Sequence, residues 1–201
     1  MAIDGRLIRL RALEPEDAER AYRWINDREN VSRYLMARYP YSMSFEKEFM
    51  AEATKKNEFS EARFAIETKD GVHIGMCGLH QARPEDRTAE LGIMIGEVEY
   101  QSRGYGSDAV LTLVTFGFET MNLNRVSLGT FEFNERAYAV YKKIGFVDEG
   151  REREAYYQDG RYWDILRMSV LRREFDALHR AAAVPATEPA PVTSVNTPAG
   201  A

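Results

Sequence analysis

Two glycines separated by one residue, Gly104 and Gly106, stand where a strand-like segment gives way to a helical run of apolar residues. A helix that begins at glycines presents free backbone N–H groups and the positive end of its dipole, and the missing Cβ atoms let a phosphate come close. Gln101 and Arg103 could add side-chain donors. The spacing therefore favours a phosphate-binding loop, while a plain turn from strand into helix stays open.

The same loop satisfies the loose dinucleotide pattern G-x-G-x-x-G/A, with Ala109 in the last place. That pattern indicates a dinucleotide site when it lies in a β-α-β unit of a parallel sheet and an acid follows about 20 residues later. Here strand-like segments of antiparallel type precede the loop, and Glu119 and Glu132 fall at poor spacings. The context therefore disfavours a nicotinamide-dependent oxidoreductase.

The segments around the loop predict how it is positioned. Alternating and apolar runs indicate strands, and Asp70-Gly71 and Asp159-Gly160 indicate hairpin turns. Ser44 is expected to begin the second helix, although Lys47 stands where a capping box would have an acid. The expected elements are a strand over 6–13, helices from 15 and from 44, strands over 62–68, 72–81 and 88–96, a helix over 104–121, a strand over 125–133, a helix over 134–144 and two strands within 145–175.

This order of elements predicts the fold class. Strands joined by hairpins pair antiparallel, and the central β-α-β crossover makes one parallel pair. We therefore expect a mixed α/β domain whose central sheet is mostly antiparallel and is flanked by helices.

Composition and charge limit the classes of function. The 201 residues carry a net charge of −5 with acids and bases interspersed, which argues against a nucleic-acid partner. No apolar run approaches the ~20 residues of a membrane span, and the N-terminus does not resemble a signal peptide. The expected location is therefore the cytoplasm. One cysteine, Cys77, and three histidines without ligand-like spacing predict no metal site.

The end of the chain differs in composition from the rest. Residues 179–201 are of low complexity and rich in Pro, Ala and Thr. Such a composition cannot bury enough apolar surface to order itself. We expect one folded domain over residues 1–178 and a disordered tail over residues 179–201.

Four stretches of the sequence together resemble one protein family. The run Gln101 to Gly106 has the form Q/R-x-x-G-x-G/A, which is the pyrophosphate loop of the GNAT superfamily of N-acetyltransferases. "AELGIMIG" resembles the fourth strand of that family, and "NERAYAVYKKIGFVDEG" is similar to its Asn-containing block. The opening "IRLRALEPEDAERAYRWIND" resembles the subgroup that includes ribosomal-protein N-terminal and spermidine/spermine acetyltransferases. One departure is Ser102, where many relatives have glycine.

The resemblance implies acetyl-CoA as co-substrate and a role for several residues. It implies that the parallel pair of strands is splayed and that a Tyr141 hydroxyl protonates the departing thiolate, while Glu90 accepts the amine proton directly or through water. Asn134 would touch the coenzyme. The residues implied to bind the coenzyme are Ile93, Met94 and Ile95 through their backbone, together with Gln101, Ser102, Arg103, Gly104, Tyr105, Gly106, Ser107 and Asn134.

Each of these side chains also has an ordinary structural explanation. Tyr141 falls on an apolar helical stripe and could be a core aromatic residue. Asn134 is well placed to cap the helix that follows it. Glu90 could be an exposed acid on a strand. On the neighbouring predicted strand, His80 and Cys77 are weaker candidates for the chemistry.

The acceptor is expected between the first two helices and the final hairpin. The resemblance implies a primary amine, with a protein N-terminus or a polyamine preferred over an amino sugar or aminoglycoside. A non-catalytic sensor of acyl-CoA is the alternative from another class, and a homodimer stays open. The aromatic and acidic side chains expected near the acceptor are Tyr34, Tyr39, Tyr41, Glu152, Glu154, Tyr156, Tyr157, Tyr162 and Trp163.

Overall fold

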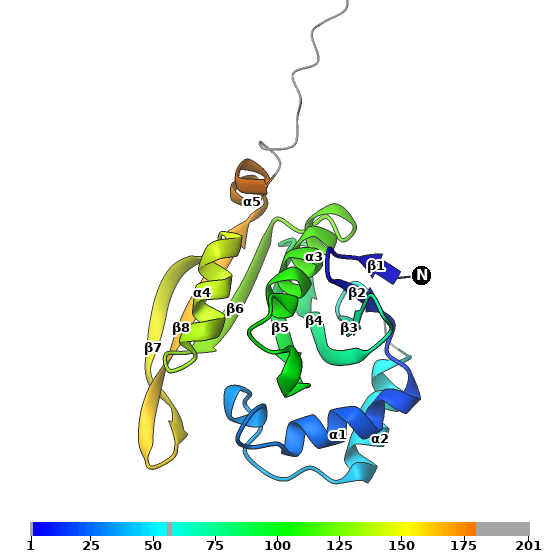
Figure 1. Cartoon of the computed structure of the whole chain (residues 1–201). Helices are drawn as coiled ribbons and strands as arrows, with labels where there is room; N and C mark the ends of the chain where they lie inside the picture. The colour runs from blue at the N-terminus through cyan, green and yellow to red at the C-terminus, as the bar shows by residue number, and fades with distance from the viewer. Residues whose placement is uncertain (1, 56–57, 180–201) are drawn as a thin grey trace, which may run out of the picture.

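The computed structural model describes residues 2–55 and 58–179 of the chain. The tail predicted over residues 179–201 lies outside the described residues, except for His179, which ends a helix. Eight strands form one sheet in the order β1-β2-β3-β4-β5-β6-β8-β7 (Figure 1). The strands are β1 (Ala2–Asp4), β2 (Ile8–Arg11), β3 (Ala62–Thr68), β4 (His73–Arg83), β5 (Thr88–Ile95), β6 (Arg125–Phe131), β7 (Val147–Gln158) and β8 (Arg161–Leu171).

Neighbouring strands pair antiparallel, with one exception. β5 and β6 run parallel, as the predicted crossover requires. The mixed α/β sheet with one parallel pair is therefore confirmed. The chain reverses at Asp70-Gly71 between β3 and β4 and at Asp159-Gly160 between β7 and β8, the two predicted hairpin turns.

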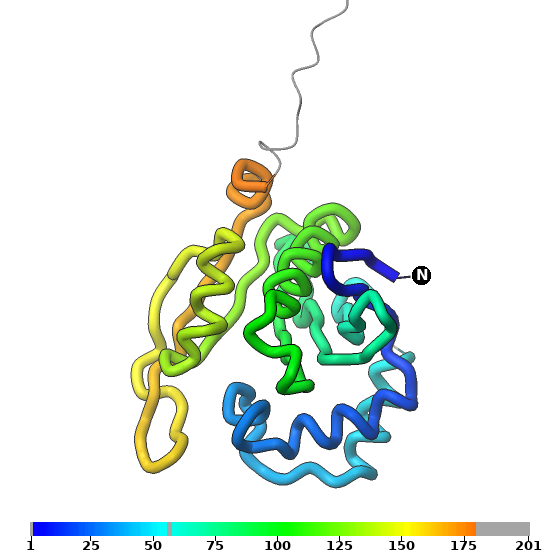
Figure 2. The backbone as a smooth tube through the Cα atoms, viewed as in Figure 1, coloured from blue at the N-terminus to red at the C-terminus, as the bar shows by residue number. Residues whose placement is uncertain are grey.

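Helices cover both faces of the sheet. Alternation along β3 separates two cores: Phe64 and Ile66 pack in the larger one with α3, whereas Ala65 packs on the opposite face with residues of α1 and α2. Figures 1 and 2 show α1 and α2 side by side below the sheet and α4 beside the β7–β8 hairpin. The helices are α1 (Ala18–Asn26), α2 (Met43–Ala53), α3 (Tyr105–Glu119), α4 (Glu135–Ile144) and α5 (Arg172–His179), with short 3-10 turns η1 (Pro15–Asp17), η2 (Ser32–Tyr34) and η3 (Val98–Tyr100).

The structure departs from the sequence prediction most clearly at three places. α2 is capped by Ser42, whose Oγ accepts a hydrogen bond from the Phe45 N–H at 3.1 Å, so the prediction of a start at Ser44 is wrong by two residues. The expected first strand is preceded by β1, which pairs with it across the turn at Gly5. The end of the expected last strand is α5, because Phe175 is buried against Phe118 of α3.

Candidate active site at the splayed strands

The parallel strands β5 and β6 separate after a short contact. Among the described residues, their ladder consists of three pairs and ends at Glu90 opposite Ser127. β5 nevertheless continues to Ile95 and β6 to Phe131. The backbone edge of β5 from Leu91 onward therefore faces an opening instead of a partner strand.

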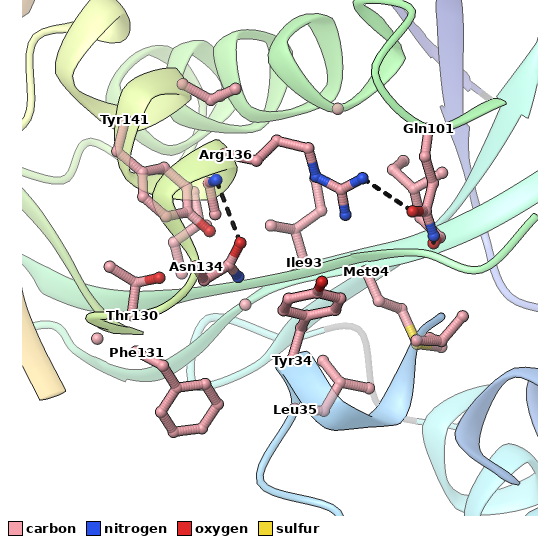
Figure 3. Close-up of a pocket in the computed structure, with 18 of the residues that line it drawn as sticks. Tyr34, Leu35, Ile93, Met94, Gln101, Thr130, Phe131, Asn134, Arg136 and Tyr141 are labelled. Atoms are coloured by element: carbon pink, nitrogen blue, oxygen red, sulfur yellow. Dashed lines mark hydrogen bonds between the residues drawn. The ribbon is translucent and has the colours of Figure 1, made fainter. Parts of the chain in front are cut away.

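A cleft of about 460 Å³ fills this opening. Its walls come from β5, β6, η2, the loop before α3, and α4 (Figure 3). The residues predicted as site members that line it are Glu90, Ile93, Met94, Ile95, Gln101, Ser102, Gly104, Gly106, Ser107, Asn134 and Tyr141.

The glycine loop delivers the N-terminus of α3 to this cleft. Gly104 is the N-cap residue and has φ of 91°, a left-handed conformation that favours glycine. The Asp108 N–H donates to the Gly104 carbonyl at 3.0 Å and closes the first helical turn, so the N–H groups before it have no partner within the helix. Ser102 also has positive φ, 57°, at the place where many relatives have glycine. The loop can therefore hold an anion.

Arg103 and Tyr105 do not line the cleft, although the sequence placed both among the coenzyme-binding residues. The Arg103 guanidinium donates to the Glu99 carbonyl at 3.2 Å. The Tyr105 ring packs edge-on against Tyr100 at 5.4 Å between centroids. Both side chains therefore contact the segment before α3, and their place among the coenzyme-binding residues stays a prediction.

Arg136 of α4 is a cleft residue that the sequence reading missed. Its guanidinium donates to Gln101 Oε1 at 2.9 Å, and it lies 5.6 Å from the centre of the Tyr34 ring. Gln101 also donates from Nε2 to the Ile95 carbonyl at 3.0 Å. Figure 3 shows Arg136 reaching across the cleft to Gln101. A helix, a loop and a strand thus meet through two side chains far apart in sequence, which no local pattern indicates.

Asn134 and Tyr141 lie at the α4 side of the cleft. Asn134 Oδ1 accepts a hydrogen bond from the Ala137 N–H at 3.3 Å, so it caps α4 as predicted while lining the cleft. Tyr141 is 7% exposed, and its ring packs near Phe146 within the larger core. Burial raises the pKa of Tyr141 to about 12. The ring is therefore a core residue, while the side chain also forms part of the cleft wall.

Glu90 lies at the point where the strands separate. Its carboxylate accepts a hydrogen bond from Arg167 at 3.3 Å, and Arg167 also donates to Glu152 at 2.7 Å. On its other side β5 pairs with β4, and in that ladder Glu90 is directly opposite His80. Cys77 is buried, and burial raises the pKa of its thiol far above the usual range. A protonated, enclosed thiol is unsuited to nucleophilic attack.

The expected acceptor residues are scattered. Tyr34 lines the cleft, together with the apolar Leu35, Met36 and Ile165, which the sequence did not single out. Tyr156 is buried, and its hydroxyl donates a hydrogen bond to the Leu35 carbonyl at 3.2 Å, so it helps to hold a residue of the cleft wall in place. The positions outside the described lining of the cleft are Tyr39, Tyr41, Glu152, Glu154, Tyr157, Tyr162 and Trp163.

In the described ranges 2–55 and 58–179, no helix is long and apolar enough to cross a membrane. Within the same ranges, no three His, Cys, Asp or Glu side chains gather as metal ligands would.

Comparisons with known proteins extend over most of the chain. The family model described as Acetyltransferase (GNAT) domain matches residues 7–147. The chain is 33% identical over 174 residues to the putative ribosomal N-acetyltransferase YdaF of Bacillus subtilis, covering 84% of this chain and 93% of that protein. It is 30% identical over 173 residues to the spermidine N(1)-acetyltransferase of Escherichia coli K12, covering 86% and 90%. The crystal structure of spermidine N-acetyltransferase from Vibrio cholerae, in complex with CoA and spermine, matches with a TM-score of 0.76 and 29% identity over 84% of this chain and 98% of that one.

Proposed function

Because the chain belongs to the GNAT acetyltransferase family, we propose that it moves the acetyl group of acetyl-CoA directly from the thioester to a primary amine. That the protein is an N-acetyltransferase follows from the family and its relatives. The direct route and the acceptor are the parts proposed here. The observation that carries the proposal is the early end of the β5–β6 ladder at Glu90 and Ser127, which leaves a strand edge open inside a cleft.

The chemistry of the lining fits the coenzyme. Unpaired N–H groups at the start of α3, with glycines at 104 and 106, suit a pyrophosphate. The open backbone edge at Ile93 and Met94 supplies donors and acceptors for an amide-containing arm and for the thioester oxygen. Arg136 lies next to the loop and adds a cationic donor toward the same phosphates.

The side chains of the cleft divide the chemistry between them. Glu90 takes the proton that the acceptor amine must lose before or during attack on the thioester carbon. Tyr141 donates its hydroxyl proton to the sulfur as the carbon–sulfur bond breaks. The hydroxyl is protonated at neutral pH, and its raised pKa makes it a weaker acid than an ordinary tyrosine. The reference pKa of a thiol is about 8.5, so transfer of the Tyr141 proton to sulfur is uphill, and the phenolate regains a proton from solvent once coenzyme A leaves.

The acceptor class is a polyamine or a protein N-terminus, supported by the names of two relatives, a spermidine acetyltransferase and a putative ribosomal acetyltransferase. An amino sugar or aminoglycoside is the alternative acceptor. A non-catalytic sensor would hold acyl-CoA in the same loop without turnover.

A panel of amines incubated with acetyl-CoA, with free thiol as the readout, tests the proposal. We expect thiol release with at least one polyamine or peptide N-terminus. Gly104→Val should strongly weaken acetyl-CoA binding, because a branched side chain at φ of 91° is strained and displaces the loop.

Gly71→Val is the matched control. Gly71 has φ of 84° and open space around its Cβ position, in a hairpin away from the cleft. Both variants should lose about 1–3 kcal/mol of stability from the strained backbone, and only Gly104→Val should lose affinity. Equal affinities in two folded variants would sink the phosphate-loop assignment, and coenzyme binding without thiol release from any amine would establish the sensor.

A further inference from the structure

The His80 ring lies over two glycines, Gly78 of β4 and Gly92 of β5. A Cβ atom at Gly78 would stand 2.8 Å from His80 Cε1, and one at Gly92 would stand 3.2 Å from His80 Nε2. A side chain at either position would therefore push the ring away. Gly92 lines the cleft, so the imidazole sits directly behind the cleft wall.

The two ring nitrogens face different surroundings. Nδ1 lies 3.3 Å from Glu61 Oε1. Nε2 is the atom beside Gly92, on the strand face where Glu90 stands directly opposite His80 in the ladder. Side chains opposite each other in an antiparallel pair have Cβ atoms about 4.5–5.5 Å apart, a separation that one water between the Glu90 carboxylate and the imidazole can bridge.

Glu61 lies on the side of His80 that faces away from the cleft. It pairs with Arg63, and both residues line a second hollow of about 310 Å³ with Phe45 and Phe49 of α2. The Glu61 side chain is 31% exposed, so solvent reaches the carboxylate there. Glu90, His80 and Glu61 thus form a row of titratable groups from the cleft across β4 to solvent.

We propose that His80 is a proton relay: it accepts at Nε2 the proton that Glu90 has taken from the amine and releases the Nδ1 proton to Glu61. Glu61 then loses that proton to solvent and Glu90 is a carboxylate again. His80, whose side chain is 34% exposed, exchanges protons with solvent and returns to its Nδ1–H tautomer for the next turnover. The transfers neither oxidise nor reduce any group. The relay rests on the proposed function, because it presumes that Glu90 receives a proton from an acceptor amine. Glu90 lines the cleft and its side chain is 40% exposed, so the relay gives its proton an exit that does not cross the space proposed for the coenzyme and the acceptor.

The charges around His80 suit this task. Burial lowers the pKa of His80, and the Arg63 guanidinium lowers it further, while Glu61 and Glu90 oppose them by favouring the charged ring. Arg167 contacts Glu90 on the side of the cleft. The net effect leaves the imidazole neutral at neutral pH and therefore able to accept a proton.

Three variants separate a relay from a packing role. His80→Phe keeps a flat ring over the glycines and removes both nitrogens, and His80→Ala leaves a space that free imidazole can enter. Glu61→Gln removes the exit carboxylate. We expect His80→Phe to lower kcat by about 10- to 100-fold with acetyl-CoA affinity and Tm nearly unchanged. Imidazole should restore turnover in His80→Ala but not in His80→Phe.

The pH profile gives a second readout. With the same amine, the wild-type kcat should fall as the pH is lowered and His80 becomes charged. This fall in kcat should be absent in His80→Phe. His179→Gln, on α5 where His179 bonds the Ile144 carbonyl, is the control and should keep the wild-type rate. Wild-type thiol release with unchanged kcat and pH profile in His80→Phe overturns the relay alone. If the wild-type protein releases thiol with none of the amines in the panel, the proposed function and the relay are both overturned.

Discussion

At the scale of single residues, Tyr141 shows how one side chain meets two demands. Its ring belongs to the larger core, and its side chain forms part of the cleft wall beside Asn134. Burial raises its pKa to about 12. Since the acid form is the proton donor, a raised pKa preserves that form as the pH increases. A tyrosine of ordinary pKa is also protonated at neutral pH, so packing against apolar neighbours extends the protonated state to higher pH and makes the hydroxyl a weaker acid.

Tyr141→Phe should therefore separate chemistry from packing. We expect turnover to fall by about 10²–10⁴-fold, with small changes in acetyl-CoA affinity and Tm. In the wild type, Tyr141 should cause no loss of kcat up to about pH 10, because its raised pKa lies above that. Tyr141→Ala should cost about 3–5 kcal/mol of stability.

Tyr138→Phe is the matched control for this measurement. Tyr138 lies on the same helix, and its hydroxyl donates to Asp148 at 3.0 Å outside the cleft lining. Its loss should leave kcat at the wild-type value. If Tyr141→Phe also turned over normally, solvent would be the proton source and Tyr141 a core residue only.

At the scale of elements, α3 is anchored where its N-terminus meets the cleft. The Asp108 carboxylate, buried in the first turn, accepts hydrogen bonds from the N–H groups of Arg6, Leu7 and Ile8 at 3.1, 2.6 and 3.1 Å. Leu7 in turn lies 3.5 Å from the position of a Cβ at Gly104. The turn before β2 therefore supports the glycine loop from behind, which couples the order of the loop to the N-terminal segment.

Asp108→Ala should lower both stability and coenzyme affinity. Three backbone donors lose their charged acceptor, at a cost of about 3 kcal/mol in the free energy of unfolding. Asp108→Asn keeps one acceptor oxygen and should lose less. Denaturant unfolding and acetyl-CoA titration measure the two effects, with Asp86→Asn, an exposed acid paired to Arg83, as control. A full loss of stability with unchanged affinity would uncouple the loop from this anchor.

At the scale of the whole molecule, two groups of strands meet at the short β5–β6 ladder. β1 to β5 lie on one side of this ladder, and β6 to β8 with α4 lie on the other (Figures 1 and 2). α5 packs against α3 and the end of α4. The rings of Phe175 and Phe118 have centroids 5.3 Å apart, and His179 Nε2 lies 2.9 Å from the Ile144 carbonyl oxygen. The folded domain proposed from sequence over residues 1–178 therefore gains at least His179.

Truncation should distinguish the helix from the residues after it. Removal of residues 180–201 should leave Tm and turnover unchanged, because their composition offers little apolar surface to bury. Removal of residues 172–201 should destabilise the protein by at least the roughly 3–5 kcal/mol of a lost buried phenylalanine. A large drop in Tm after the shorter deletion would show that the terminal residues pack against the domain.

The sequence by itself determined the features that depend on neighbours along the chain. The Asp-Gly turns, the alternation along β3, the Asn134 cap and the helix that starts after Gly104 are all visible in short windows, because φ preferences and capping bonds act over a few residues. These signals were sufficient for the order of the elements from β2 to β8 and for the class of fold. They were insufficient where two local solutions compete, as with Ser42 and Ser44 at the start of α2.

Only the tertiary structure decided which distant residues meet. The separation of β5 from β6 leaves a cleft, Arg136 reaches Gln101 across it, and Arg103 turns away to Glu99. The contact of His80 with Glu61 and the burial of α5 also join segments that are apart in the sequence. Such contacts depend on the register of strands and on side-chain packing between elements, so their energies are set by the assembled sheet and leave no periodic trace in the chain.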